Sequence, residues 1–239
     1  FNYMRIALYF INWNDSFYFP FIQAHYGQFC DKIVMYDNLS SDNSYARAKE
    51  YGWYYRTFGR KGMLNDQHYL DVKNHCWKEC RGKGYDYVIV CDADEFIVPP
   101  LDSGNPFPIV NGFDMISDSL PVKNIFEINS GLPSESYSKQ AIFNPDVVQE
   151  INYVHGCHKH RAVLDQHRAT GNNLPEQRAQ LYHFRNIGGV ERKITRHHEY
   201  MCRMSEFNKK HKMGFHYEHS DDAKREEWKV LMAQAQVLY

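Results

Sequence analysis

Residues 87–96 constrain the fold of this chain more than any other stretch. Their apolar part, residues 88–91, is a continuous Val-Ile-Val-Cys run with no polar alternation. A strand that is buried on both faces of a parallel sheet shows such a run. The run ends at once in three carboxylates, Asp92, Asp94 and Glu95. The stretch therefore predicts a central strand whose carboxyl end carries a dense negative charge.

This negative charge predicts a bound divalent cation. Crowded carboxylates are unfavourable at a strand end unless a cation neutralises them. Mn²⁺ and Mg²⁺ prefer oxygen ligands and often leave positions open for water or for substrate phosphates. In open α/β sheets, ligands bind beyond the carboxyl ends of the strands, which is where this motif stands. The alternative is that Asp92 and Asp94 lie in a solvated loop, because a D-x-D motif alone is a weak signal.

The first hundred residues alternate between strand and helix patterns. This order indicates an α/β fold with a mostly parallel central sheet, right-handed crossovers and flanking helices. The first expected helix contains Pro20, which could interrupt it. The expected strands lie at residues 4–11, 32–36, 53–58 and 88–91, and the expected helices at residues 17–29, 44–51 and 65–80.

The second half of the chain is less regular. We expect strands at residues 122–128, 147–154 and 179–184, a long helix from residue 190 and an amphipathic helix from residue 221. The sequence shows no internal repeat and no clean domain boundary. We therefore predict a single domain over residues 1–239.

Composition restricts the classes of partner. The formal net charge is −1 and no long basic or acidic run occurs, so the charge gives no reason to expect nucleic acid or a membrane surface as a partner. No apolar run reaches the length of a transmembrane segment. The six cysteines include no C-x-x-C pair, which favours reduced thiols and a cytoplasmic location.

Polar clusters follow three of the expected strands, at residues 12–15, 37–42 and 92–95. The carboxyl ends of parallel strands meet at one edge of a sheet, where ligands bind. We therefore expect these clusters to line the same pocket.

Histidine is concentrated in the second half, where ten of the thirteen lie between residues 155 and 219. One of them could complete the coordination of an ion held by Asp94, and our candidate is His183, at the end of its expected strand. The other interpretation is that most are surface or hydrogen-bonded core histidines. His158 and His160 would face the same side of a strand. A structural zinc site is a further alternative, although its four ligands would be spaced too tightly for one tetrahedral ion. These ligands would be His155, Cys157, His158 and His160.

Two of these motifs resemble the glycosyltransferase family 2-like proteins. Residues 37–42, Asp-Asn-Leu-Ser-Ser-Asp, look like the D-N-x-S-x-D signature, and residues 92–96, Asp-Ala-Asp-Glu-Phe, look like the D-x-D-E-F of one subgroup. Residues 183–185, followed by a helix that carries Lys193, are similar to a terminal His-Tyr and Lys block. The blocks occur in the family's order. Two departures are Phe184 in place of Tyr, and Asn-Trp-Asn-Asp at residues 12–15 in place of the usual Asn-Glu.

The resemblance implies a GT-A (Rossmann-like) fold that transfers a sugar from a UDP- or GDP-linked donor to a hydroxyl of a glycan or other acceptor. Residues 1–100 would form the nucleotide-binding half, and residues 101–239 a smaller acceptor-side half with the C-terminal helices.

The same resemblance implies roles for individual residues. Mn²⁺ or Mg²⁺ on Asp94, with Asp92 and His183 as further ligands, would stabilise the departing diphosphate. Asp92 could instead lie nearer to the ribose or reach the ion through a water. Lys73 and Lys193 are candidate phosphate-binding cations, and the alternative for each is a solvated surface lysine. The residues expected to bind the nucleotide-sugar are Asn12, Asn14, Asp15, Asp37, Lys73, Asp92 and Ala93.

An inverting transfer also needs a carboxylate base that deprotonates the acceptor hydroxyl. Glu127, Glu135 and Asp146 lie in the segment where the family places its acceptor contacts. We choose Glu127, because it ends an expected strand. A retaining transfer needs no such base.

Two other functions compete with this one. Haloacid-dehalogenase-like phosphatases also place D-x-D after an apolar strand, with the first Asp as nucleophile. Phe96 departs from their usual motif, and here the motif follows a late strand rather than the first. A nucleotide-sugar-binding module could keep the same fold without turnover.

Overall fold

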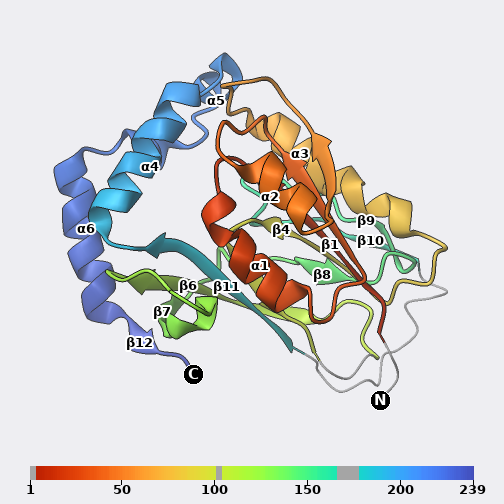
Figure 1. Ribbon diagram of the computed structural model, residues 1–239. Helices are drawn as coiled ribbons and strands as arrows, with labels where there is room; N and C mark the ends of the chain where they lie inside the picture. The colour runs from red at the N-terminus through yellow and green to blue at the C-terminus, as the bar shows by residue number, and fades with distance from the viewer. Residues whose placement is uncertain (1–3, 101–103, 166–177) are drawn as a thin grey trace.

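The computed structural model describes residues 4–100, 104–165 and 178–239, which form two main sheets with flanking helices (Figure 1). The predicted α/β class, with a mostly parallel central sheet, is confirmed. None of the helices in these ranges has the length and apolar character that a membrane span requires.

The central sheet has five strands, and the first four in spatial order run parallel. The last strand pairs antiparallel with its neighbour. The spatial order is β3 (Tyr54–Thr57), β2 (Lys32–Asp37), β1 (Ile6–Asn12), β4 (Tyr87–Asp92) and β8 (Ile142–Phe143).

The second sheet also has five strands and mixes parallel with antiparallel pairs. Its order is β12 (Gln236–Val237), β7 (Ser130–Pro133), β6 (Ile109–Ser117), β11 (Arg178–Ile187) and β5 (Glu95–Val98). A separate two-stranded antiparallel pair consists of β9 (Val148–Glu150) and β10 (Val163–Leu164). The two main sheets are joined directly, because β4 of the first leads into β5 of the second.

In residues 4–92 helices alternate with strands, and residues 190–234 hold a second group of helices. In Figure 1, the two longest helices lie side by side at the left, at the end of the second sheet that faces away from the chain's N-terminus. These are α4 (Val190–Arg203) and α6 (Asp221–Gln234). The others are α1 (Phe19–Tyr26), α2 (Ser44–Glu50), α3 (Asp66–His75) and α5 (Glu206–Lys210), with 3₁₀ turns at Ser16–Tyr18, Cys76–Cys80, Ile125–Glu127 and Phe215–Glu218.

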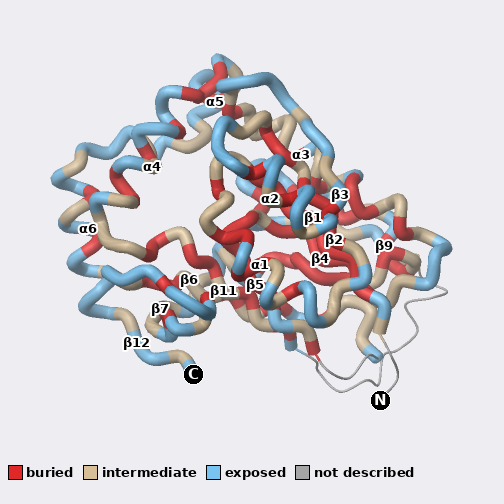
Figure 2. The backbone as a smooth tube through the Cα atoms, in the orientation of Figure 1, coloured by how far each residue is buried: buried red, intermediate tan, exposed pale blue. Residues whose placement is uncertain are grey.

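The core lies on both faces of the central sheet. Every residue of β1 is buried (Figure 2), and its alternating side chains enter two different hydrophobic clusters. Leu8 and Phe10 join the cluster that continues into the second sheet, whereas Ala7 and Tyr9 face the cluster around Trp77. A strand packed on both faces carries no polar alternation, which is why its sequence identified it.

The predicted strand at residues 122–128 is wrong. This segment forms a 3₁₀ turn closed by a capping box. The Asn124 side chain accepts a hydrogen bond from the backbone N–H of Phe126, and the Glu127 carboxylate accepts one from the N–H of Asn124. The N-x-x-E spacing is a capping signature that competes with the apolar residues around it.

The boundaries predicted for other helices and strands differ less from the structure. Pro20 does not interrupt the first helix, because it stands in the first turn of α1, where a missing N–H costs nothing. The expected helix at residues 65–80 is α-helical only to His75 and continues as a 3₁₀ turn. Of the expected strand at residues 147–154, only β9 is formed.

Candidate active site

The acidic motif occupies the junction between the two sheets. Asp92 ends β4 and Glu95 begins β5, so the two residues between them form a tight link. The backbone N–H of Ala93 donates to the Ile11 carbonyl in β1 at 3.0 Å, and the N–H of Phe184 in β11 donates to the Asp94 carbonyl at 2.8 Å. The motif is therefore fixed to both sheets by its backbone.

Asp94 is a buried carboxylate surrounded by cations. Its Oδ2 accepts a hydrogen bond from Nε of Arg185 and lies 3.5 Å from Nε2 of His183, while its buried Oδ1 has no hydrogen-bond partner among the described residues. Burial opposes the charge, but Arg185 and His183 outweigh it and lower the pKa of Asp94. Asp94 is therefore an anion with one unused oxygen.

His183 is held by a second carboxylate. Its Nδ1 lies 2.8 Å from Oδ1 of Asp114 on β6, and the Tyr137 ring stacks on the imidazole at 3.9 Å between centroids. Burial alone would lower the pKa of His183, but the charge of Asp94 and the contact with Asp114 raise it to about 9. These contacts direct Nε2 toward Asp94.

Asp92 belongs to a neighbouring group of buried charges. Nζ of Lys73 on α3 lies 2.8 Å from its Oδ2, and Nζ of Lys139 lies 3.7 Å from the same oxygen. Lys139 also pairs with Glu95 at 2.5 Å, and Glu95 accepts the backbone N–H of Asp92 at 2.9 Å. Burial opposes the charge of Asp92, yet Lys73 and Lys139 lower its pKa. Lys73 is thus a buried ion-pair residue and not a surface lysine.

The residues around Asp94 fit a divalent cation. The orphaned Asp94 oxygen would gain a ligand, and an imidazole whose other nitrogen contacts a carboxylate is the usual arrangement of a metal-binding His. No group of three or more His, Cys, Asp or Glu in the described ranges could hold a metal by itself. Two protein ligands suffice for Mg²⁺-type ions when substrate phosphates and waters supply the rest. Asp92 as a third ligand stays a prediction, since its carboxylate contacts lysines.

Asn12 and Asp37 join the ends of β1 and β2. Nδ2 of Asn12 donates to Asp37 at 2.7 Å and to the hydroxyls of Ser40 and Ser44. Its buried Oδ1 has no hydrogen-bond partner in the part of the chain that the structure describes. Asp37 also accepts the Ser40 N–H at 2.9 Å and the Tyr55 hydroxyl at 3.2 Å. In this structure Asp37 stabilises the loop after β2, and its contact with a nucleotide stays a prediction.

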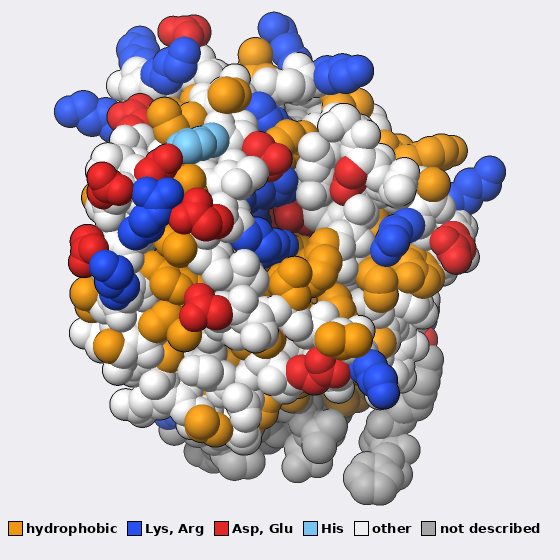
Figure 3. Space-filling model, turned by 60° about the vertical axis from the view of Figure 1, so that its left-hand side comes forward, with side chains coloured by type: hydrophobic (Ala, Val, Ile, Leu, Met, Phe, Trp, Pro, Cys, Tyr) orange, Lys and Arg blue, Asp and Glu red, His pale blue; other side chains and the backbone are white. Residues whose placement is uncertain are grey.

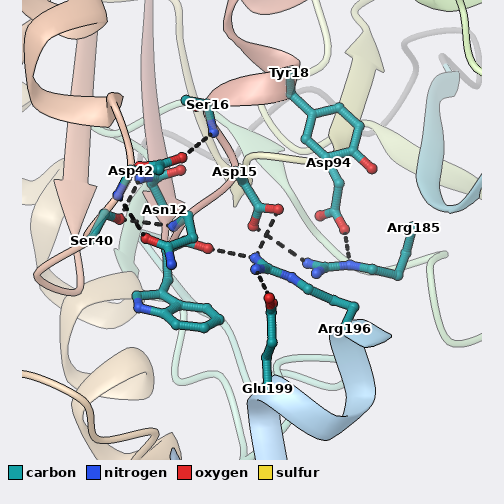
Figure 4. A network of polar contacts seen from close by, with 12 residues as sticks. Asn12, Asp15, Ser16, Tyr18, Ser40, Asp42, Asp94, Arg185, Arg196 and Glu199 are labelled. Atoms are coloured by element: carbon teal, nitrogen blue, oxygen red, sulfur yellow. Dashed lines mark hydrogen bonds and ion pairs between the residues drawn. The ribbon is translucent and has the colours of Figure 1, made fainter. Parts of the chain in front are cut away.

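Asn14 and Asp15 form the loop after β1. Asn14 adopts a left-handed backbone (φ 51°), and its Oδ1 accepts the N–H of Ser41 at 2.7 Å. Asp15 pairs with Arg196 at 2.9 Å and with Arg185 at 3.8 Å (Figure 4). Burial raises the pKa of Asp15, although both arginines oppose the rise. Arg185 therefore lies between two carboxylates, Asp15 and Asp94.

Two cavities share the Asp15–Arg185 pair in their walls. Figure 3 shows the hollowed face, with basic side chains deep in the hollow and hydrophobic ones beside it. The first cavity, about 160 Å³, lies at the ends of β1 and β4 and is lined by Lys73 and Asp92 with several aromatic rings. The second, about 390 Å³, is lined by the β1–α1 loop and α4.

The predicted residues are only partly brought together. Asp15, Lys73 and Asp92 line the first cavity, and Asn14 with Asp15 lines the second. Glu127 lines neither, and its carboxylate accepts the backbone N–H groups of residues 122–124, which lower its pKa. Its role as a base stays a prediction. Lys193 pairs with Glu227 on α6 at 3.4 Å.

Among the residues that the structure describes, the four proposed zinc ligands at residues 155, 157, 158 and 160 form no metal-binding group. His158 and His160 do not share a strand, because residues 155–158 form a turn and only a single bridge joins Tyr153 to His160. His155 contacts Gln67 at 3.1 Å, and His158 contacts the Ser136 carbonyl at 2.7 Å. The alternative of a zinc site at these residues is not supported.

Arg192, Arg196 and Lys139 were not predicted from the sequence. Arg192 and Arg196 are four residues apart on α4 and line the second cavity. Their spacing places them on one helix face, which was the available signal. Nothing local marks Lys139, because its carboxylate partners are distant in sequence.

Comparison with known proteins gives distant matches. No family model and no curated protein matches the chain. Among solved structures, it is similar to glucosyl-3-phosphoglycerate synthase from Mycobacterium tuberculosis with Mn²⁺, uridine diphosphate and glucosyl-3-phosphoglycerate, at TM-score 0.30 and 16% identity. That match covers 46% of this chain and 44% of the synthase, so it spans less than half of either.

Two further solved structures overlap more of the chain. A mycobacterial protein matches at TM-score 0.41 and 12% identity, over 75% of this chain and 65% of the other. S. aureus TarS matches at TM-score 0.39 and 11% identity, over 82% of this chain and 65% of the other. At these values the likeness identifies neither a family nor an activity for this chain.

Proposed function

We propose that this chain is a metal-dependent glycosyltransferase that moves a sugar from a nucleotide-diphosphate donor to an acceptor hydroxyl, in glycan or polysaccharide synthesis. The main support is the site at Asp94: a buried carboxylate with an unused oxygen, next to a histidine oriented by Asp114. The site stands at the carboxyl end of β4, where open α/β sheets bind their ligands.

The first cavity suits the donor. It combines cations, Lys73 and Arg185, with the aromatic rings of Trp13, Tyr69 and Tyr200. Fixed cations stabilise the negative charge that develops on a departing diphosphate, and aromatic faces pack against rings of a nucleoside. We assign donor binding to this cavity, together with the loops that carry Asn12, Asn14 and Asp37.

Asp94 and His183 would hold Mn²⁺ or Mg²⁺. When bound, such an ion acts as a Lewis acid toward phosphate oxygens. The chain itself supplies the orientation: Asp114 fixes the imidazole, and Arg185 fixes the Asp94 carboxylate. Ala93 and Asp92 would lie against the donor, because the backbone of this link is tied to β1.

The proposal is tested by incubating the chain with a panel of UDP- and GDP-sugars and Mn²⁺. Removing one preorganised electrostatic group costs ~10²–10³-fold in rate. We therefore expect Asp94→Asn to lower donor turnover by at least ~100-fold. The control is Asp71→Asn, which makes the same change on an exposed face of α3. It should leave the rate unchanged, and thermal melting confirms that both variants fold.

Each competing function predicts a different pattern. Hydrolysis of phosphomonoesters that is lost in Asp92→Asn, with no nucleotide-sugar turnover, would overturn the proposal in favour of a phosphatase. Nucleotide-sugar binding with no turnover under any condition would favour a binding module.

A further inference from the structure

The second cavity has an excess of positive charge. Its walls carry three guanidinium groups, on Arg185, Arg192 and Arg196, against two carboxylates, on Asp15 and Glu199. Arg185 is shared with Asp94, so carboxylates on both sides satisfy it. The excess positive charge of the cavity therefore lies on the wall that α4 forms.

Arg192 is the arginine of this cavity that pairs with no carboxylate in the described ranges. No ion pair joins it to any residue in the described ranges, and its one hydrogen bond there goes from Nη1 to the Ile187 carbonyl at 3.1 Å. A guanidinium has five N–H donors, so most of those on Arg192 stay available. Its head group lies over the rings of Phe17 and Tyr18, at 5.1 Å and 5.8 Å from their centroids. The aromatic faces hold the guanidinium at the cavity without neutralising it.

Arg196 lies one helical turn further along the same wall. It pairs with Asp15 at 2.9 Å and with Glu199 at 2.9 Å (Figure 4). Its head group also lies over Trp13 and Tyr200. The Glu199 side chain is 45% exposed, so this ion pair is screened and can be exchanged for a stronger anion. Two fixed guanidinium groups on one wall match the oxygens of a phosphate or carboxylate.

We propose that the second cavity binds an anionic group of the acceptor, a phosphate or a carboxylate, through Arg192 and Arg196. The inference rests on the proposed function and adds the chemical class of the acceptor. The cavity shares the Asp15–Arg185 pair with the one that holds Asp92 and Lys73, so an acceptor anchored there stands next to the donor. The acceptor is selected by its charge as well as by its hydroxyl.

The proposed anion site is tested by titration calorimetry at fixed ionic strength, which measures how tightly the whole chain binds inorganic phosphate and acetate. A hydrogen bond to a charged group is worth enough to change affinity by ~10-fold or more. We expect Arg192→Gln to weaken binding of the preferred anion by at least that factor. Glu199→Gln should tighten it, because Arg196 loses a competing carboxylate. A variant that merely misfolds cannot produce this gain.

The matched control is Arg225→Gln, which removes an arginine on α6 that pairs with Glu191 and Asp222. It should leave anion binding unchanged. Tighter binding of phosphate than of acetate assigns a phosphate ester to the acceptor, and the reverse assigns a carboxylate. Equal binding by the Arg192→Gln and Arg225→Gln variants would overturn the inference.

UDP binding, measured in parallel, separates the two proposals. We expect Arg192→Gln to leave UDP affinity unchanged, since the donor occupies the first cavity. If Arg192→Gln weakened UDP as much as phosphate, the arginines would serve the donor and the acceptor inference would fall. If UDP bound to no variant while phosphate binding followed Arg192, the anion site would stand and the glycosyltransferase proposal would fail.

Discussion

His183 takes part in both the stability and the proposed chemistry of this chain. Its imidazole is enclosed by Asp94, Asp114 and the Tyr137 ring, so the neutral and charged forms differ strongly in energy. The two carboxylates favour the charged form in the metal-free protein. A bound cation would replace that proton, because a metal-ligating imidazole is neutral.

The raised pKa of His183 predicts how stability depends on pH. In the folded chain the pKa rises from 6.5 to about 9. The resulting stabilisation, on the order of 3 kcal/mol, is complete below about pH 6.5 and is lost as the pH rises through about 9. With a chelator present, the difference in free energy of unfolding between the wild type and His183→Gln should be largest near pH 6 and shrink by pH 10. Denaturant titrations measure it.

His198→Gln is the matched control. His198 is exposed and pairs with Asp221 on the surface, so its replacement should cost little at any pH. A His183→Gln difference that stayed constant from pH 6 to pH 10 would show that the imidazole is not charged in the folded protein.

The sequence identified the residues at strand ends and Lys73 on α3, but not the two arginines on the face of α4. Asp94 and Asp92 were recognisable because an apolar strand delivers them to the sheet edge, where ligands bind. Arg192 and Arg196 were not recognised, since a cation on a helix carries no sign of what faces it. Glu127 was wrongly predicted to end a strand. Its N-x-x-E spacing instead forms the cap of a 3₁₀ turn.

At the level of elements, the segment at residues 134–139 is held against β6 by one glycine. Gly112 donates its N–H to the Ser138 hydroxyl at 3.0 Å and accepts the Ser134 N–H at 2.8 Å. A Cβ at this position would lie 2.0 Å from the Tyr137 carbonyl carbon. The close approach matters because this segment carries Tyr137 to His183 and Lys139 to Glu95.

Gly112→Ala should therefore disturb the site from a distance. We expect a loss of ~1–3 kcal/mol in free energy of unfolding, as for other overpacked positions, together with weaker UDP binding. Denaturant titration and calorimetry measure the two effects. Gly82→Ala is the comparison, because nothing lies within 4 Å of the added Cβ and only the positive φ of 66° opposes it. Equal costs for both variants, with UDP affinity intact, would contradict this role of Gly112.

The α4 helix was predicted at the right place in the sequence, but its function was not. Its spacing of apolar residues shows which face is buried. Its position is set by β11, which pairs with β5 and β6 over long sequence distances. Those pairings decide that its arginines face the β1–α1 loop, and no local pattern contains that information.

At the level of the whole molecule, the site exists because two sheets meet at one short link. The central sheet was predictable, since strands buried on both faces have a distinctive composition. The second sheet was only partly predictable. It includes pairs such as β12 with β7, in which only two residues of each strand are paired and the strands lie far apart in the sequence. The junction brings Asp94, in the link between the sheets, next to His183 and Asp114 of the second sheet.

We propose that this junction holds a divalent cation together with a nucleoside diphosphate. Mn²⁺ uptake in the presence of UDP, followed by electron paramagnetic resonance of the free ion, measures it directly. We expect the wild type and Asp71→Asn to bind Mn²⁺ equally, and Asp94→Asn to bind it at least ~10-fold more weakly. Mn²⁺ affinity in Asp94→Asn equal to that of the wild type would contradict the account.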